Sequence, residues 1–178
     1  MISRPTAQRG TTPIEACVAL AVAAIVAGAA APSLQNVIDA RRLDGAAAQL
    51  ATDIQYTRTL AVARSEPVRL TVQTITGGSC YVVHTGNAGQ CPCSAGGATA
   101  CTGGARALKT VQLAASDHVT LQSNAGSILF DPLHGTSSPT ATLRIVGTGD
   151  RAIHHVVNVM GRVRSCSPLA AVPGYRAC

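Results

Sequence analysis

Residues 14–31 read IEACVALAVAAIVAGAAA, an apolar run interrupted only by Glu15. Residues 1–10 before it are polar and basic, with Arg4 and Arg9, and Pro32 follows it. A run of this length predicts a hydrophobic helix, either a cleaved export signal or a segment that stays with the chain. We therefore treat the sequence after this helix as the domain that the helix carries.

Three explanations of the apolar run compete. A cleaved secretory signal fits the basic start and the small residues 29–31, but Pro32 would then follow the cut. A plain transmembrane anchor leaves Glu15 unexplained, because a charge at the entrance to an apolar helix costs free energy. The third explanation gives Glu15 a function.

The spacing of four features resembles the type IV pilin and pseudopilin family. Arg9-Gly10 ends the basic leader, Glu15 and the apolar helix follow it, and Pro32 lies where family members carry a helix-kinking proline. The resemblance implies that a prepilin peptidase cleaves between Gly10 and Thr11, that the new N-terminus is methylated and that the helix sits in the inner membrane before assembly. Glu15 would pair with the N-terminal amine of a neighbouring subunit, so that the buried charge has a partner.

Helical spacing continues beyond the apolar run. One face of the next segment carries Leu43, Ala47, Leu50, Ile54, Thr57 and Ala61. Ser65-Glu66-Pro67 stops the pattern, since residues before proline avoid helical geometry. We predict one long helix from about Ile14 to Arg64, kinked at Pro32.

After Pro67 the apolar period changes from 3.6 to 2. Alternation predicts strands at 68–72, 108–113, 119–122 and 141–146, with a further β-rich run at 155–163. Residues 77–104 are rich in Gly, Ser, Ala and Cys, and we predict a long loop there, held by disulfides.

A long helix followed by strands is typical of an α+β fold. We expect a pilin-like architecture, with the helix packed on an antiparallel β-sheet domain. The expected divisions are a leader at 1–10, a hydrophobic transmembrane or filament-core half-helix at 11–32, an amphipathic half-helix at 33–66 and a β-rich domain at 67–178. The stretch AVARSEPVRLTV at 61–72 also resembles the helix-to-strand junction of the FimT/GspH branch of minor pilins.

The formal charge is +6, carried by thirteen arginines and the single Lys109. A basic surface attracts polyanions such as nucleic acid or anionic lipid, although an arginine-rich soluble domain without such a partner has the same composition. Seven cysteines are present, and Cys17 lies in the apolar run. The other six predict disulfides in an oxidising compartment. The alternative is a metal cluster of Cys80, Cys91, Cys93 and Cys101.

The stretch VVNVMGRVRSC at 156–166 is the candidate binding element. Gly161 suggests a turn or bulge, and Arg162 and Arg164 alternate so that both point to one side. Their Cα atoms would lie about 6.6 Å apart, close to the spacing of phosphates along one nucleic-acid strand. The alternative without a binding function is a solvated edge strand on which the arginines discourage pairing with the strand of another chain.

The C-terminal residues support this element. A disulfide between Cys166 and Cys178 would rigidify it, and Arg176 would add a third cation. The arrangement resembles the GRxR motif of FimT-type minor pilins, which is associated with DNA binding during uptake by type IV pili. The scarcity of aromatic residues argues against base stacking, so binding would be electrostatic and independent of sequence.

We expect no enzymatic site, no cofactor and no metal. His154 and His155 would point to opposite faces of a strand, and no nucleophile motif surrounds the serines. The leading hypothesis is a minor pilin near the tip of a type IV pilus, with its domain in the periplasm before assembly, that binds DNA in natural transformation. The alternatives are a structural pseudopilin of a type II secretion system, and a secreted disulfide-bonded domain.

Overall fold

The computed structural model describes residues 12–94, 96 and 99–178, and divides the chain into two units, Met1–Ile38 and Asp39–Cys178. Helix α1 (Pro13–Arg64) contributes to both. The strands are β1 (Val68–Ile75), β2 (Gly78–Thr85), β3 (Ala107–Ala114), β4 (Thr120–Ser123), β5 (Ser127–Phe130), β6 (Ser137–Ser138), β7 (Ala141–Val146), β8 (Ala152–Val157) and β9 (Val163–Cys166). Two short 3₁₀ helices, η1 (Ala115–Asp117) and η2 (Pro168–Ala170), complete the elements. The predicted α+β class with antiparallel sheets is confirmed.

The start of α1 has its own local cause. The backbone N–H of Glu15 donates to Thr12 Oγ1 at 3.4 Å, and Pro13 occupies the first helical position. Proline is favoured there because its missing N–H would have no partner in the first turn. Thr12 and Glu15 also have the spacing of a capping box. Glu15 therefore lies in the first turn of the helix, where a negative charge is favourable whatever else it does.

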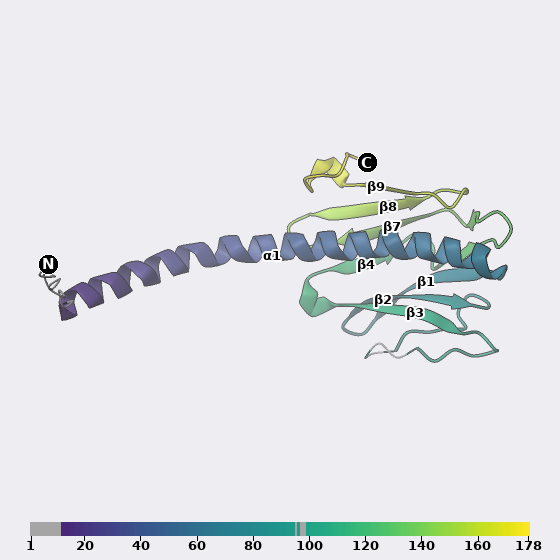
Figure 1. Ribbon diagram of the computed structural model, residues 1–178, viewed down its shortest axis with the longest axis horizontal. Coiled ribbons are helices and arrows are strands. Elements are labelled where there is room, and N and C mark those ends of the chain that lie inside the picture. Colours follow the sequence, from purple (N-terminus) through teal and green to yellow (C-terminus); the bar gives the residue numbers. More distant parts are fainter. Residues whose placement is uncertain (1–11, 95, 97–98) are drawn as a thin grey trace, which may run out of the picture. The chain divides into compact units, whose positions relative to one another are not determined.

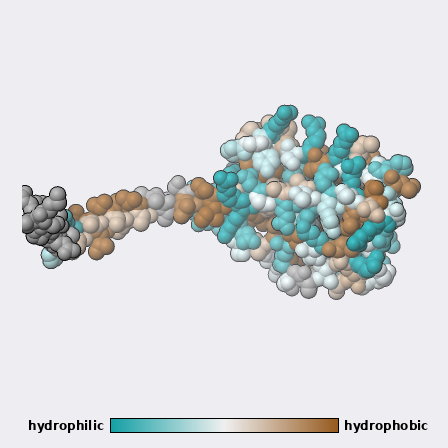
Figure 2. Space-filling view, viewed as in Figure 1, coloured by the Kyte–Doolittle hydropathy of each residue, from teal (hydrophilic) through white to brown (hydrophobic). Residues whose placement is uncertain are grey.

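The described side chains of the first unit are exposed, and many of them are apolar (Figure 2). Among the described residues, no helix combines the length and the hydropathy that crossing a membrane requires. Gly10 and Thr11 lie outside the described residues. Residue 32 lies within α1, and the kink that we expect at Pro32 stays a prediction.

In the second unit, the predicted stripe of α1 is buried. Leu43, Ala47, Leu50, Ile54, Thr57 and Ala61 are each at most 1% exposed, which confirms the helical spacing. The helix ends in a Schellman motif: Glu66 N–H donates to the Ala61 carbonyl and Ser65 N–H to that of Val62, both at 3.2 Å. Ser65 has the positive φ of 49° that this motif requires, and Pro67 follows.

Two antiparallel sheets share this helix. The first sheet has the order β3-β2-β1-β5-β6 and the second β4-β7-β8-β9. Residues 39–64 of α1 lie across both (Figure 1), and one core joins the helix to the inner faces of the two sheets. Its largest buried side chains include Leu50, Tyr81, Phe130 and Ile145. Each such apolar side chain stabilises the fold by about 1.5–3 kcal/mol.

One prediction along the chain is wrong. Residues 77–104 are not all loop, because β2 begins at Gly78 and runs as a central strand with Tyr81, Val82 and Val83 buried. The glycines that suggested a loop form its tight turn, where Gly77 has φ 87°. In the predicted β-rich run at 155–163, a turn at 158–162 that contains Gly161 separates β8 from β9.

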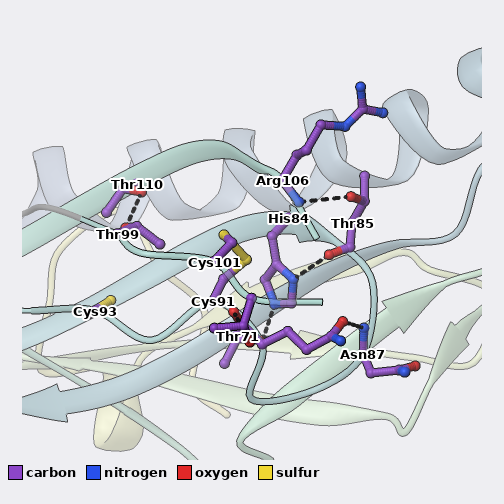
Figure 3. The surroundings of a disulfide bond; sticks show 12 residues. Thr71, His84, Thr85, Asn87, Cys91, Cys93, Thr99, Cys101, Arg106 and Thr110 are labelled. Atoms are coloured by element: carbon purple, nitrogen blue, oxygen red, sulfur yellow. Dashed lines mark hydrogen bonds between the residues drawn. A yellow bond between two sulfur atoms is a disulfide. The ribbon is translucent and has the colours of Figure 1, made fainter. Parts of the chain in front are cut away.

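The loop after β2 covers the outer face of the first sheet. Disulfides join Cys91 to Cys101 (Figure 3) and Cys80 to Cys93, so these cysteines are not a metal cluster. The Gln73 amide anchors the described part of the loop, donating to the Cys91 carbonyl at 3.2 Å and accepting from Cys93 N–H at 2.9 Å. Under the loop, the Thr71 hydroxyl lies 2.8 Å from His84 Nε2. Burial lowers the pKa of His84, which is therefore neutral near pH 7.

Asp53 is a polar anchor between the helix and the first sheet that is almost completely buried. The Tyr81 hydroxyl of β2 donates to Asp53 Oδ2 and Lys109 Nζ of β3 contacts Oδ1, both at 2.6 Å. The Asp53 side chain is only 3% exposed. Burial, with the nearby carboxylate, raises the pKa of Tyr81, so this hydroxyl keeps its proton. A carboxylate buried this deeply depends on both donors.

We expect Lys109→Met to lower the free energy of unfolding by about 2–4 kcal/mol, because it leaves the Asp53 charge with one neutral donor. Urea unfolding followed by circular dichroism measures the change. Arg106→Gln is the control: it also removes one cation from an ion pair, but the Arg106–Glu66 pair is exposed at 3.6 Å and should change stability by less than about 1 kcal/mol. Equal effects of the two variants would contradict the assignment.

Candidate nucleic-acid interface

The hairpin between β8 and β9 carries the predicted arginines. Asn158 N–H donates to the Arg162 carbonyl at 3.1 Å, Gly161 N–H to the Asn158 carbonyl at 2.8 Å, and Arg162 N–H to Asn158 Oδ1 at 3.0 Å. Gly161 has φ 68°, which is the left-handed residue of a three-residue hairpin loop with a bulge. The glycine of the motif therefore sets the direction in which Arg162 leaves the turn.

Gly161 is also enclosed. A Cβ at this position would collide with the Gly135 carbonyl oxygen and would lie 2.9 Å from Arg58 Cδ. Arg58 Nε of α1 donates to that same carbonyl at 2.9 Å. Ser137 of β6 holds the loop from the other side, with N–H to the Val159 carbonyl at 2.9 Å and Oγ to the Asn158 carbonyl at 2.6 Å. The hairpin is thereby fastened to the helix and to the first sheet.

Arg162 and Arg164 are both exposed, and the residues between and after them face the other way. Ser165 Oγ lies 2.8 Å from Nδ1 of the buried His155, and Val163 and Ser165 lie beside residues 51–55 of α1. Arg164 pairs in register with the exposed Val156 of β8. The alternation therefore places the Arg164 side chain on the outer face of the second sheet, away from the helix.

The C-terminal segment places Arg176 near Arg164. Cys166 and Cys178 form a disulfide, and Ser167 N–H donates to the Arg176 carbonyl at 2.8 Å. The buried Ser167 hydroxyl donates to the Ala152 carbonyl at 2.9 Å, while Val172 packs in the core. A disulfide closing so short a loop stabilises the segment by about 3 kcal/mol in the chain-entropy account.

A groove of about 310 Å³ opens between these elements. It is lined by Val156, Arg164, Ser165, Cys166, Arg176, Ala177 and Cys178. Two guanidinium groups flank an apolar floor, and within the described residues neither group has an ion-pair or hydrogen-bond partner. Planar guanidinium groups suit phosphate oxygens, so the groove can hold a phosphodiester.

The histidines of β8 point to opposite faces, as predicted. His155 is buried toward the helix, and burial lowers its pKa; His154 lies on the outer face, and burial followed by the charge of Arg144 lowers its pKa. Among the described residues, no three His, Cys, Asp or Glu side chains are grouped as metal ligands.

The family model described as "Type II transport protein GspH" matches residues 46–161, more than half of the chain. The chain belongs to the GspH family. It is a pilin-like protein of the minor pilin and pseudopilin class. The families of this class are structural. Membership implies assembly with other pilin subunits as a membrane-anchored, periplasmic component. The match ends at Gly161, so Arg162, Arg164 and Arg176 of this GspH-family chain lie outside it.

Two crystal structures of the type IV minor pilin FimU from Pseudomonas aeruginosa resemble this GspH-family chain. One has 18% identity and a TM-score of 0.52, covering 76% of this chain and 95% of that chain. The other has 19% identity and a TM-score of 0.49, covering 75% and 98%. At this identity the first likeness shows the pilin fold alone. No curated protein sequence matches the chain significantly.

The sequence of the GspH-family chain indicates the arginines and the C-terminal disulfide, but neither the groove nor the contact that fastens the hairpin. Arg58, Gly135 and Gly161 are far apart in the sequence and share no motif. Gly135 and Gly161, with φ 63° and φ 68°, each indicate a turn in the sequence. Nothing in the sequence around them indicates that the two turns are in contact.

We expect Gly161→Ala to lower the free energy of unfolding by about 2–4 kcal/mol, since it adds a collision to the cost of a left-handed φ. Gly149→Ala is the matched control, with φ 63° but no neighbour near its Cβ, and should cost about 1 kcal/mol. Urea unfolding compares the two. A Gly161 variant no less stable than the Gly149 variant would show that the packing contact is unimportant.

Proposed function

We propose that this protein is a minor pilin that joins a type IV pilus near its tip and binds DNA without sequence preference in natural transformation. The observation that carries the proposal is the groove on the outer face of the second sheet. Arg164 and Arg176 flank it, and Arg162 extends the row toward the hairpin turn. Gly161 supports the binding residues through the backbone, since it is itself buried.

The chemistry of the groove favours phosphate over bases. Guanidinium groups donate hydrogen bonds to phosphate oxygens, and those contacts carry no sequence information. The chain has three tyrosines, one phenylalanine and no tryptophan, and Tyr81 and Phe130 are buried in the core. A stacking platform for unpaired bases is therefore not part of the proposal, and duplex DNA is the expected ligand.

The proposal also covers how the N-terminal segment is processed and inserted in the membrane. Prepilin peptidase would cleave between Gly10 and Thr11, the new N-terminus would be methylated, and the helix would rest in the inner membrane with the domain in the periplasm. Glu15, exposed in the first turn of α1, would then pair with the N-terminal amine of the neighbouring subunit in the filament. Pro32 would allow the helix to bend between its two halves.

A second function is supported by the description of the matching family as a type II transport protein. In that case the chain is a minor pseudopilin with a structural role in a type II secretion system. Arg162, Arg164 and Arg176 would then be solvated surface residues that protect the edge strand β9 from pairing. Binding to DNA separates the two functions.

We expect the full-length protein in detergent to bind a 30-base-pair duplex, and Arg162→Ala with Arg164→Ala to weaken binding about tenfold or more. Fluorescence anisotropy over a salt series gives the slope of the logarithm of the binding constant against the logarithm of the salt concentration. This salt slope should be lower in magnitude by about two in the double variant, one for each lost phosphate contact. The control, Arg41→Ala with Arg42→Ala, removes two exposed charges from α1. If both double variants bind equally, the motif is not the binding site.

We expect the mature protein, isolated from its native membrane, to begin at Thr11 and to carry one methyl group on its N-terminus. Intact-mass and N-terminal peptide mass spectrometry measure both features. A mature chain starting at Pro32 would instead identify residues 1–31 as a secretory signal and would overturn the proposal of filament assembly.

A further inference from the structure

The outer face of the second sheet continues the row of arginines beyond the groove. The strands lie in the order β4-β7-β8-β9, and their register aligns side chains in rows across the sheet. Arg164 of β9 is opposite Val156 of β8, which is opposite Thr142 of β7. The next row contains Cys166, His154 and Arg144, followed by Gln122 of β4.

Arg144 therefore shares the face of Arg164. Residues two apart on a strand point to the same side, and directly paired residues also share a side. On β7 the neighbours of Arg144, which are Leu143 and Ile145, are buried in the core, while Arg144 is exposed. Within the described chain, no ion pair or hydrogen bond occupies the Arg144 guanidinium.

The distance suits a phosphate backbone. Arg144 lies two strands and two residues from Arg164, so at about 4.8 Å between strands and about 3.3 Å per residue their Cα atoms are roughly 12 Å apart. Arg162 immediately precedes β9, and strand spacing would put its Cα about 6.6 Å from that of Arg164. Arg144 is thus separated from Arg164 by about twice that spacing, two residues further along the strands and two strands across the sheet.

The acidic side chains nearest in sequence to these four strands lie away from the hairpin turn. None of β4, β7, β8 and β9 contains an aspartate or glutamate. Asp150 lies in the turn between β7 and β8 and Asp117 ends η1 before β4, both at the end of the sheet opposite to the β8–β9 turn. The Arg144 charge also contributes to the lowered pKa of His154, so the two side chains are electrostatically coupled.

We infer that Arg144 is a further phosphate-binding residue, and that a DNA backbone crosses the outer face diagonally from Arg162 on the hairpin to Arg144 on β7. His154 lies beneath this path, beside the Cys166–Cys178 disulfide, with its Nδ1 3.7 Å from Cys178 Sγ. This inference rests on the proposed DNA binding and adds the direction and the extent of the site.

The test uses full-length protein in detergent and a 30-base-pair duplex. Arg144→Gln should weaken binding about three- to tenfold and lower the salt slope by about one, because one phosphate contact is lost. Arg42→Gln is the matched control, with the same charge change on the exposed surface of α1 and no expected effect beyond a general weakening of less than about twofold. Arg144→Lys should retain most of the affinity, because the cation is kept.

A gain of binding provides an independent measurement. Gln122 is exposed and directly opposite Arg144, so Gln122→Arg should tighten binding and raise the slope by about one, whereas Gln49→Arg on α1 should not. Equal affinities of Arg144→Gln and Arg42→Gln, with no gain from Gln122→Arg, would overturn the inference. If the Arg162 and Arg164 double variant alone loses affinity, the proposed function stands without the extension. If the wild-type protein binds vesicles of anionic lipid but not DNA, both fail.

Discussion

The Asp53 carboxylate is the constraint on which the arrangement of helix and sheets depends. Apolar contacts hold α1 against the sheets, but apolar packing tolerates rotation and sliding of a helix whose stripe consists largely of alanine and leucine. Asp53 accepts from Tyr81 on β2 and from Lys109 on β3 at 2.6 Å, and such short contacts to a buried charge have one geometry. Lys109 is the only lysine of the chain. These two contacts fix the register of the helix against the first sheet.

The outer faces of the two sheets differ in how far loops cover them. The loop after β2 is closed over the first sheet by two disulfides, and the polar residues beneath it, such as Thr71 and His84, bond to one another. On the second sheet the third disulfide lies at the edge, and exposed residues alternate with core residues along β7 and β8. The strands of the second sheet carry arginine but no acidic side chain, and a basic surface of this kind attracts polyanions.

The elements with strong periodicity were predictable from the sequence. The buried stripe from Leu43 to Ala61, the stop at Pro67 and the alternation of β1, β3 and β7 follow from periods of 3.6 and 2. The strand β2 was not predicted, because its glycines and Cys80 suggested a loop. Its segment 81–83, YVV, is nevertheless fully buried inside the first sheet. The core covers one face of β2 and the loop joined to Cys80 covers the other, so side chains on both faces are buried and the alternation is lost.

For the candidate site, the sequence by itself determined the cations and the cysteines of the disulfide: two arginines two residues apart, a glycine before them, and cysteines at 166 and 178. Alternation predicts that Arg162 and Arg164 point to one side, and both side chains are exposed. Only the tertiary structure decided that Arg176 borders the same groove, that Gly161 packs on Arg58 and Gly135, and that Arg144 belongs to the same face. The physical reason is that these relations depend on strand register and on contacts between residues distant along the chain, and local sequence preferences contain no information on either.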